Sequence, residues 1–504
     1  MKNDPMESRC VKYFRQVDKG ILILVSIFVL TAFFLLTPWI YSDGVGEYAW
    51  VRSLFMDGDL DCSNEFAYYT SEFQRRFGWE DAGYDLAPIK TPTGLQANKY
   101  PIGTALLWSP FFVVGHFMTV LCNKLGLEYD ADGYSRFYVL LVSFGSCFYA
   151  FIGLLLGYKM SRFYFSRNVA LLATLTIWFA SSIPVYMYLY PSLPHSTSMF
   201  VVSLFIYFWW RTRWMRNAKQ WALLGAIGGL MSMVRLENVV FFVLPTAEIV
   251  YRLYQHLKDK EWHKIRSYAG KAVLFFGCSL LIFSPQVIVW KIVFGKFFVN
   301  PYTATEVLKI TSQRFEYAYE DPYTKPDSST GVVSILIFFS HPHLIRTFFG
   351  SGHGLFTWTP IILFAVLGYI QLFRRDRNIA IFLILAFISI SYVVSCVGGA
   401  GASFGHRYLM KCGLIYILGL ASLLQFCYKR IKFSVLITIC SFFIIWNGLF
   451  ILQYSTGLVK KEGPISWSTM LKNQFTRAPK RLVSVAKPFL TGRSSVYEKY
   501  KEKK

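Results

Sequence analysis

Long runs of apolar residues, separated by short polar connections, recur along the chain from residue 20 to residue 452. Most runs approach the roughly 20 residues that an α-helix needs to cross a bilayer. Helices satisfy their backbone hydrogen bonds within lipid, so the pattern predicts an all-α polytopic membrane protein. The predicted spans, about eleven, are 20–40, 135–157, 169–187, 196–210, 220–235, 238–254, 271–292, 355–373, 379–397, 409–427 and 433–452.

The connections between these runs differ in charge, and the difference predicts sidedness. Five short connections are basic, and short basic loops stay on the cytoplasmic side. They are 158–168, 211–219, 254–267, 374–378 and 428–432. The first large loop, 41–134, holds thirteen acidic and six basic residues, so we expect it outside. A second large outer loop is expected at 293–354, and 1–452 is read as one transmembrane domain.

One apolar segment, 100–121, does not fit this alternation. If it crossed the bilayer, all five basic connections would lie outside. We therefore predict helices that lie in the outer interface or dip back, and Pro101, Ser109 and Pro110 favour a broken element over a span. The C-terminal tail, 453–504, argues the other way: its twelve basic and three acidic residues would also lie outside. Long segments follow the rule that basic residues stay on the cytoplasmic side only weakly, so we base the topology on the short loops.

Composition agrees with a membrane protein and argues against a nucleic-acid partner. The 504 residues are 54% hydrophobic and 16% charged, where soluble proteins approach a quarter charged. The formal net charge is +23, but the basic residues cluster in short loops, where they set topology. The nine cysteines show no metal-type spacing. Cys62 and Cys122 are candidates for a disulfide if their loop faces an oxidising compartment.

Unusual polar residues collect at the predicted outer face. Ionisable groups at membrane depth are costly and are usually functional or paired. These residues are Asp43, Glu47, Lys99, His195, Arg235, Glu237, His341, His343, Arg346, His353, His406 and Arg407. This convergence on one face is the main functional signal in the sequence.

Several of these residues also have purely structural interpretations. Asp43 can be a helix cap, and Glu47, four residues later, fits a structural partner of it better than a base. Arg235 and Glu237 fit a simple pair at a turn, which we favour. The His341-x-His343 spacing can bind metal but has no clear third ligand, so no metal ligand is assigned. His195 and His353 can line a pocket or merely lie at the interface.

Arg407 and His406 follow the glycine-rich stretch "GGAGASFG", which lets the backbone approach a ligand closely. A guanidinium suits a phosphate, and nearby cations can stabilise a leaving phosphate. A carboxylate at the membrane edge, such as Asp43, can act as general base on an acceptor hydroxyl. A carboxylate and cations at one membrane face together suit the transfer of a sugar from a lipid-phosphate donor.

The order of these parts resembles the GT-C superfamily of membrane glycosyltransferases, which includes protein O-mannosyltransferases and aminoarabinose transferases of lipid A. The matching pieces are Asp43 after the first span, "NKYPIGTALLWSPFF", "SRFYFSRN", "PHSTSMF", "SGHGLFTWTPIILFAVLG" and "GGAGASFGHRYLM". The resemblance implies interfacial helices in the first outer loop and a catalytic or supporting role for Asp43. The chain departs from the pattern in having no Asp-Glu dipeptide after the first span.

We therefore expect an inverting glycosyltransferase with Asp43 and Glu47 as catalytic residues. Lys99, His195, His353, His406 and Arg407 would bind the phosphate or substrate. The partners would be a polyprenyl-phosphate sugar, membrane lipids, and a glycan, lipid or protein acceptor. Whether the reaction needs a divalent metal stays open, because metal dependence varies across the superfamily. The location would be the bacterial inner (plasma) membrane, with the site facing the periplasm or exterior.

Two rival functions remain. A transporter or lipid flippase should place ionisable residues near mid-membrane and on both sides. Here the span centres are nearly free of them, with Glu248 as an exception. A structural or assembly membrane protein would need no pocket, and the cluster at one rim argues mildly against it.

Overall fold

The computed structural model describes residues 18–77, 89–299, 341–396, 403–460 and 465–491. Helices dominate these residues. The longer ones are α2 (Lys19–Leu35), α3 (Asp43–Arg52), α4 (Ser63–Phe77), α5 (Gly103–Lys124), α6 (Arg136–Tyr164), α7 (Arg167–Phe179), α8 (His195–Thr212), α9 (Ala218–Val234), α10 (Val243–Lys258), α11 (Trp262–Phe294), α18 (Arg377–Cys396), α19 (Gly413–Tyr428), α20 (Phe433–Ser455) and α21 (Trp467–Thr491).

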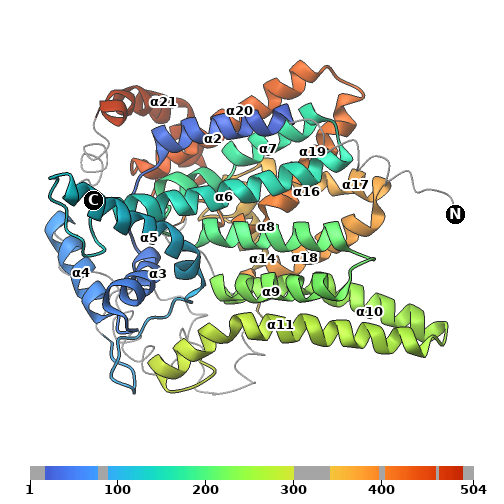
Figure 1. Cartoon of the computed structure of the whole chain (residues 1–504). Coiled ribbons are helices and arrows are strands. Elements are labelled where there is room, and N and C mark those ends of the chain that lie inside the picture. Colours follow the sequence, from blue (N-terminus) through green and yellow to red (C-terminus); the bar gives the residue numbers. More distant parts are fainter. Residues whose placement is uncertain (1–17, 78–88, 300–340, 397–402, 461–464, 492–504) are drawn as a thin grey trace.

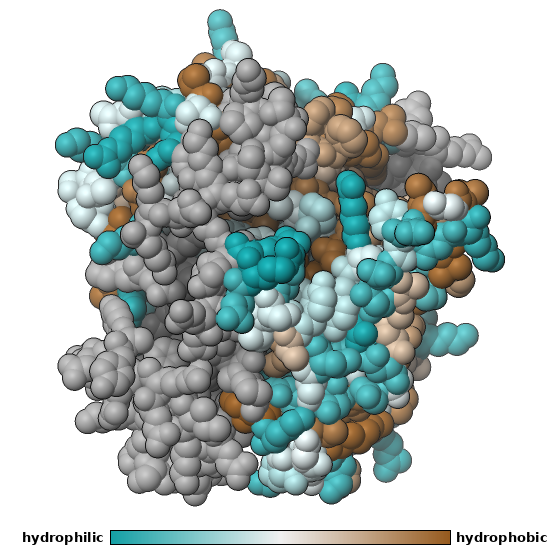
Figure 2. All heavy atoms as spheres, turned by 90° about the vertical axis from the view of Figure 1, so that its left-hand side faces the viewer, coloured by the Kyte–Doolittle hydropathy of each residue, from teal (hydrophilic) through white to brown (hydrophobic). Residues whose placement is uncertain are grey.

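The long helices run roughly side by side, and α3, α4 and part of α5 gather at one end of the bundle (Figure 1). Figure 2 looks onto this end, where hydrophilic side chains cover much of the described surface and hydrophobic patches lie mostly toward its edges. The described part of the chain has six helices long and apolar enough to cross a membrane, and α2 and α7 are shorter apolar helices. The predicted all-α membrane fold is confirmed, but the count of about eleven spans is not.

The segment predicted to be broken at 100–121 is instead the single helix α5, which is long and apolar enough to span. Pro110 lies inside it. The prediction of a break is therefore wrong, because proline removes only one helical hydrogen bond and neighbouring packing can hold the helix together. The contacts of α5 with α6 fall in the first half of α6: Tyr149 donates to Leu107 O, and His116 lies 2.7 Å from the Tyr138 hydroxyl. Whether α5 crosses the bilayer stays a prediction.

Two other predicted spans are interrupted. The span at 169–187 ends at Phe179, and a π-helical turn follows at Val185–Leu189. Asn447 of α20 donates to the Phe179 and Ser181 carbonyls, which the helix end leaves without helical partners. The span at 355–373 consists of α15 (Leu355–Trp358), α16 (Ile361–Leu367) and α17 (Tyr369–Arg375).

Gly368, between α16 and α17, meets Gly419 of α19 backbone to backbone. A Cβ added at Gly368 would collide with the Gly419 carbonyl oxygen, and one added at Gly419 would collide with the Ala365 carbonyl oxygen. Small residues allow such close approach between membrane helices. This contact holds the broken helix pair against the centre of the bundle.

The basic C-terminal tail contains the helix α21, which the sequence reading left without structure. It packs beside the last residues of α20. Gln453 donates to Gln474 Oε1 at 2.6 Å, and Gln474 donates to the Trp446 carbonyl at 2.7 Å. The boundaries of the two outer loops and of the transmembrane domain stay predictions.

Candidate functional site

Asp43 is the first residue of α3, next to Ser42, which has a positive φ of 50°. The Tyr100 hydroxyl donates to Asp43 Oδ1 at 3.1 Å, and the Ser42 hydroxyl lies 3.4 Å from the same oxygen. The other carboxylate oxygen, Oδ2, lies 3.6 Å from Arg407 Nη1. The two residues that the sequence singled out as base and phosphate ligand therefore lie side by side.

Charge holds Asp43 ionised. Burial alone would raise its pKa, but the positive charges of Arg407 and Lys99 outweigh burial, and the pKa of this carboxyl lies below its usual range. The Lys99 ammonium also lies 5.2 Å from the centre of the Tyr100 ring. Both residues of the short "KY" element thus serve the same carboxylate, one by charge and one by a hydrogen bond.

Arg407 begins a 3₁₀ turn, Arg407–Cys412, that leads into α19. Its Nη2 lies 3.4 Å from the Tyr408 hydroxyl, and its guanidinium lies 5.3 Å from the Tyr408 ring centre. Arg407 Nε is buried and has no hydrogen-bond partner among the described residues. The other two nitrogens of the guanidinium lie near Asp43 and Tyr408. The glycine-rich residues 399–402 lie outside the described part.

A second group of charged residues lies next to Asp43 and Arg407 and contacts the same Tyr408 ring. Arg235 donates to Glu237 Oε1 at 2.5 Å, and Lys411 donates to the same oxygen at 2.8 Å. The Arg235 guanidinium lies 5.0 Å from the Tyr408 ring centre, on which Arg407 also packs. Arg235 and Glu237 are thus more than a turn pair. Sequence reasoning missed Lys411, although an ionisable residue inside an apolar run is itself a functional signal.

Glu47 lies one helical turn after Asp43 and is fully buried. Neither carboxylate oxygen has a hydrogen-bond partner among the described residues, although Thr104 lies nearby. Burial raises the pKa of Glu47 well above its usual value, and the charge of Arg235 opposes this without reversing it. The two carboxyl groups of α3 therefore differ: the pKa of Asp43 is lowered, which favours the charged form, and the pKa of Glu47 is raised, which favours the neutral form.

The three histidines predicted at the site are all buried. His195 is buried with its ring 4.8 Å from Tyr186 and 5.9 Å from Tyr408, which places it against the site. His406 lies 6.1 Å from Tyr408 and interacts with His353. His353 stacks on Trp358 and has a strained φ of 114°. We see no direct contact between these two and Asp43 among the described residues.

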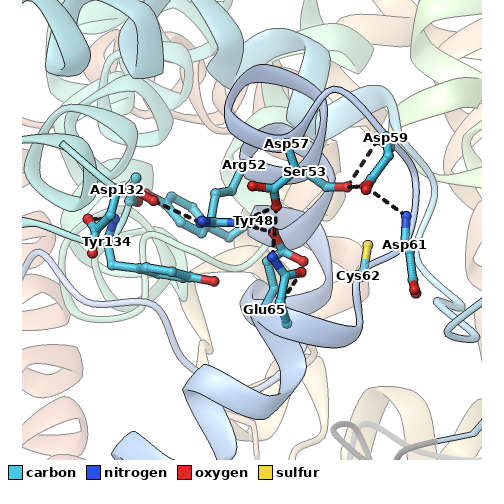
Figure 3. Close-up of polar contacts among 12 residues, drawn as sticks. Tyr48, Arg52, Ser53, Asp57, Asp59, Asp61, Cys62, Glu65, Asp132 and Tyr134 are labelled. Atoms are coloured by element: carbon cyan, nitrogen blue, oxygen red, sulfur yellow. Dashed lines mark hydrogen bonds and ion pairs between the residues drawn. The ribbon is translucent and has the colours of Figure 1, made fainter.

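Arg52, the last residue of α3, fixes this helix to α4 and to the residues before α6 (Figure 3). Its Nη1 lies 2.6 Å from Glu65 of α4 and 2.5 Å from Asp57, and its Nε donates to the Asp132 carbonyl. The guanidinium packs on the Tyr134 ring at 4.3 Å. Because α3 carries Asp43 at its other end, this buried anchor positions the candidate base.

The described residues contain no group of three or more His, Cys, Asp or Glu side chains that could hold a metal ion. His341 and His343 accordingly gain no third ligand there. Cys62 and Cys122 are both free, so the candidate disulfide is not formed. The acidic residues near Cys62 are held by ordinary partners, as Asp59 is by Ser53 and Asp61 by the Gln96 amide.

Comparisons with known proteins give structural likenesses only. No protein-family model matches the chain, and no curated protein matches it. ArnT from Cupriavidus metallidurans, in its apo state and bound to undecaprenyl phosphate, is 14% identical with a TM-score of 0.45. The match covers 96% of this chain and 73% of that one.

A third solved structure is the archaeal oligosaccharyltransferase AglB from Archaeoglobus fulgidus, in complex with an inhibitory peptide and a dolichol-phosphate. It is 12% identical with a TM-score of 0.44, and the match covers 95% of this chain and 56% of that one. At these identities, activity and substrate must be argued from the residues of this chain.

Proposed function

We propose that this integral membrane protein is a glycosyltransferase. It would transfer a sugar from a polyprenyl-phosphate donor to an acceptor at the outer face of the membrane, with inversion at the transferred carbon. Asp43 would be the general base and Arg407 the main phosphate ligand. The location, a bacterial inner membrane with the site facing outward, is part of the same proposal.

One observation supports this function most: Asp43 and Arg407 are far apart in the chain, yet their charged atoms lie 3.6 Å apart in a largely buried cluster. A transferase of this kind needs a base for the acceptor hydroxyl and a cation for the leaving phosphate in one site. Because inversion puts these two groups on opposite faces of the reacting carbon, the bound donor would have to separate this ion pair. Lys99, Arg235 and Lys411 add positive charge around them. The cluster thus carries both the group that accepts a proton and the charge that a leaving phosphate needs.

The chemical step follows from these positions. The acceptor hydroxyl oxygen would bond to the anomeric carbon as the bond from that carbon to the phosphate oxygen breaks. Asp43 would take the hydroxyl proton, and the lipid phosphate would leave with the bonding electrons. Arg407 would stabilise that oxygen more strongly as its negative charge grows, which is the kind of contact that lowers the barrier.

The pair also offers a way to prepare the base. In the structure, Arg407 is shared between Asp43 and Tyr408. A bound phosphate would compete for the guanidinium and weaken its hold on Asp43. The pKa of Asp43 would then rise toward its ordinary value, so the carboxylate would become a better proton acceptor when substrate is present. Glu47, buried one turn away, would stay neutral and support the helix.

Asp43→Asn tests the proposal. Asparagine keeps the shape of the side chain but cannot take a proton, so transfer from a labelled polyprenyl-phosphate sugar should fall by about 10²–10⁴-fold. The purified variant should unfold at nearly the wild-type temperature. Near-normal turnover by folded Asp43→Asn protein would rule out the base, and no turnover by wild-type protein with any sugar donor would count against the class.

The alternative is a polytopic transporter or lipid flippase. Its strongest sequence feature was Glu248, which the structure places in a closed pairing. Arg216 lies 3.3 Å from Glu248, and Trp209 donates to it at 2.8 Å. Arg216 and Glu248 are both buried, and each has hydrogen-bond partners, as expected of a structural ion pair. It therefore gives the transporter hypothesis no further support.

A further inference from the structure

The C-terminal helix α21 has three different faces. One face is buried and contacts the bundle through Met470, Asn473, Gln474, Ala478 and Val485. Hydrogen bonds fix this face: Gln474 binds Gln453 and the Trp446 carbonyl, and Asn473 donates to the Leu458 carbonyl at 3.0 Å. The helix is thus docked in one orientation about its axis.

A second face is apolar and exposed. Trp467, Leu471, Phe475 and Leu482 fall within about a quarter of the helix circumference, since each residue advances about 100°. Phe475 is 72% exposed and Leu482 is 52% exposed. Large apolar side chains aligned in this way on one helix mark an interaction surface. We call these four residues the apolar stripe.

The rest of the exposed surface carries the basic residues Lys472, Arg477 and Lys480. At about 100° per residue, Lys480 lies opposite the apolar stripe, Lys472 lies beside it, and Arg477 lies at the edge of the buried face. Val483, which is 79% exposed, lies between the two lysines. A helix with a basic face and an aromatic-rich apolar face is typical of helices that lie in the interfacial plane of a membrane. The described part of α21 contains no acidic residue.

The apolar stripe continues the surface of a helix that spans the membrane. The Phe475 ring lies 5.8 Å from Trp446 of α20, and Trp446 lies 5.6 Å from Phe442. Phe442 and its neighbour Ile445 are 55% and 62% exposed on α20. That helix is a candidate span with only 22% of its most apolar window buried, so its exposed face must meet lipid. The same lipid would extend onto Phe475.

From this geometry we propose that α21 is an interfacial anchor that binds anionic phospholipid. The apolar stripe would enter the acyl chains beside α20, and Lys472, Arg477 and Lys480 would meet lipid phosphates. The proposal does not depend on the proposed enzymatic function. It also gives a reason for the excess of basic residues in a tail that the topology places outside.

A second copy of the chain fits this helix less well. Two α21 helices packed through their apolar stripes would leave the basic residues of both helices on their outer sides, without an anionic partner. Anionic headgroups instead complement the basic face, at about 1 kcal/mol for each Lys or Arg near the surface. Lipid is therefore the occupant that suits both exposed faces at once.

Depth of insertion gives the first test. A fluorescent amino acid would replace Phe475 or Lys480 in the full chain, reconstituted in nanodiscs of phosphatidylcholine and phosphatidylglycerol. Lipids brominated on their acyl chains should quench the probe at 475, and aqueous iodide should quench the probe at 480. Quenching of both probes by iodide alone would place α21 in water. A probe at 475 that neither agent quenches, together with a dimer in solution, would show a second copy instead. Either result overturns the proposal.

Charge gives the second test, with a matched control. Phosphatidylglycerol added to detergent-solubilised protein should raise the unfolding temperature, whereas phosphatidylcholine should not. The double variant Arg477→Gln/Lys480→Gln should need about thirtyfold more phosphatidylglycerol for half of this rise, from two charges of about 1 kcal/mol each. Arg75→Gln/Arg76→Gln, which removes two exposed charges from α4, should respond as wild type does. An equal response of all three proteins, or no preference for phosphatidylglycerol, would overturn the proposal.

Discussion

Replacing Arg407 by alanine should remove the largest nearby positive charge from Asp43 and from a bound phosphate together. The guanidinium and the carboxylate are 3.6 Å apart, and each side chain keeps only about 15% of its surface exposed: 15% for Arg407 and 16% for Asp43. Coulomb's law at an effective dielectric constant of about 20 gives about 4–5 kcal/mol for unit charges at this distance. Part of that is offset by the cost of burying both groups.

For catalysis the comparable quantity is the loss of one charge-stabilising donor, about 3 kcal/mol or on the order of a hundredfold in rate. Arg407→Lys should recover only part of this loss, because a point charge replaces a planar fork of donors. The pH profile of kcat/KM for the donor, which reports the pKa of Asp43 in the free enzyme, should move as well. In wild type the pKa of Asp43 is depressed, so activity should persist at mildly acidic pH and fall only as pH drops through that low pKa. Without Arg407 that pKa rises, so the acid limb should move to higher pH.

The assay is turnover of a labelled polyprenyl-phosphate sugar by purified protein, measured against pH and donor concentration. Donor affinity should be measured separately, because a phosphate ligand contributes to both binding and the chemical step. Thermal unfolding of each variant serves as the folding control. Unchanged donor affinity, turnover and acid limb in folded Arg407→Lys and Arg407→Ala proteins would refute the reasoning and leave Arg407 as a structural partner of an outer-loop carboxylate.

Three other outcomes are expected. Glu47→Gln should keep near-wild-type turnover at neutral pH, because the raised pKa of the carboxyl keeps it neutral. Glu47→Ala should lower the unfolding temperature, because it opens a buried cavity. A large loss of turnover in folded Glu47→Gln protein would show that the charge of Glu47 takes part in catalysis. Gly103→Ala should destabilise the protein by about 1–3 kcal/mol, since its Cβ would collide with the Met233 backbone, while Gly448→Ala, which meets nothing within 4 Å, should not; equal unfolding temperatures would contradict this. A single cysteine at Ser166 should be shielded from a membrane-impermeant thiol reagent outside intact cells, and ready labelling there would invert the predicted topology.

The sequence was sufficient for the features that periodicity and composition control. Apolar runs predicted several helices to within three residues at each end, as at α8, α9 and α20. It failed where packing overrides local preference. The sequence predicts a break at Pro110, but packing of α5 against α6 keeps the helix continuous. It predicts one span at 355–373, but the structure divides this segment into three helices.

For the candidate site, residue type and predicted sidedness were sufficient to select Asp43, Lys99 and Arg407 as candidates. The structure brings their charges close together. The tyrosines that organise them could not be chosen in advance. The chain has 32 tyrosines, and only the fold shows that Tyr100 donates to Asp43 and that Tyr408 packs against Arg407. Partners of this kind depend on long-range contacts, which one sequence does not specify.

The backbone contact of Gly368 with Gly419 has a consequence for how this chain can vary. Each glycine already is the smallest residue, so a larger residue at one position cannot be compensated by a smaller one at the other. Coevolution methods detect contacts through compensating exchanges, and here none exist. In a saturation library the two sites should both stay glycine with no statistical coupling between them. A contact map inferred from sequence covariation would therefore leave out one of the closest helix crossings in the molecule.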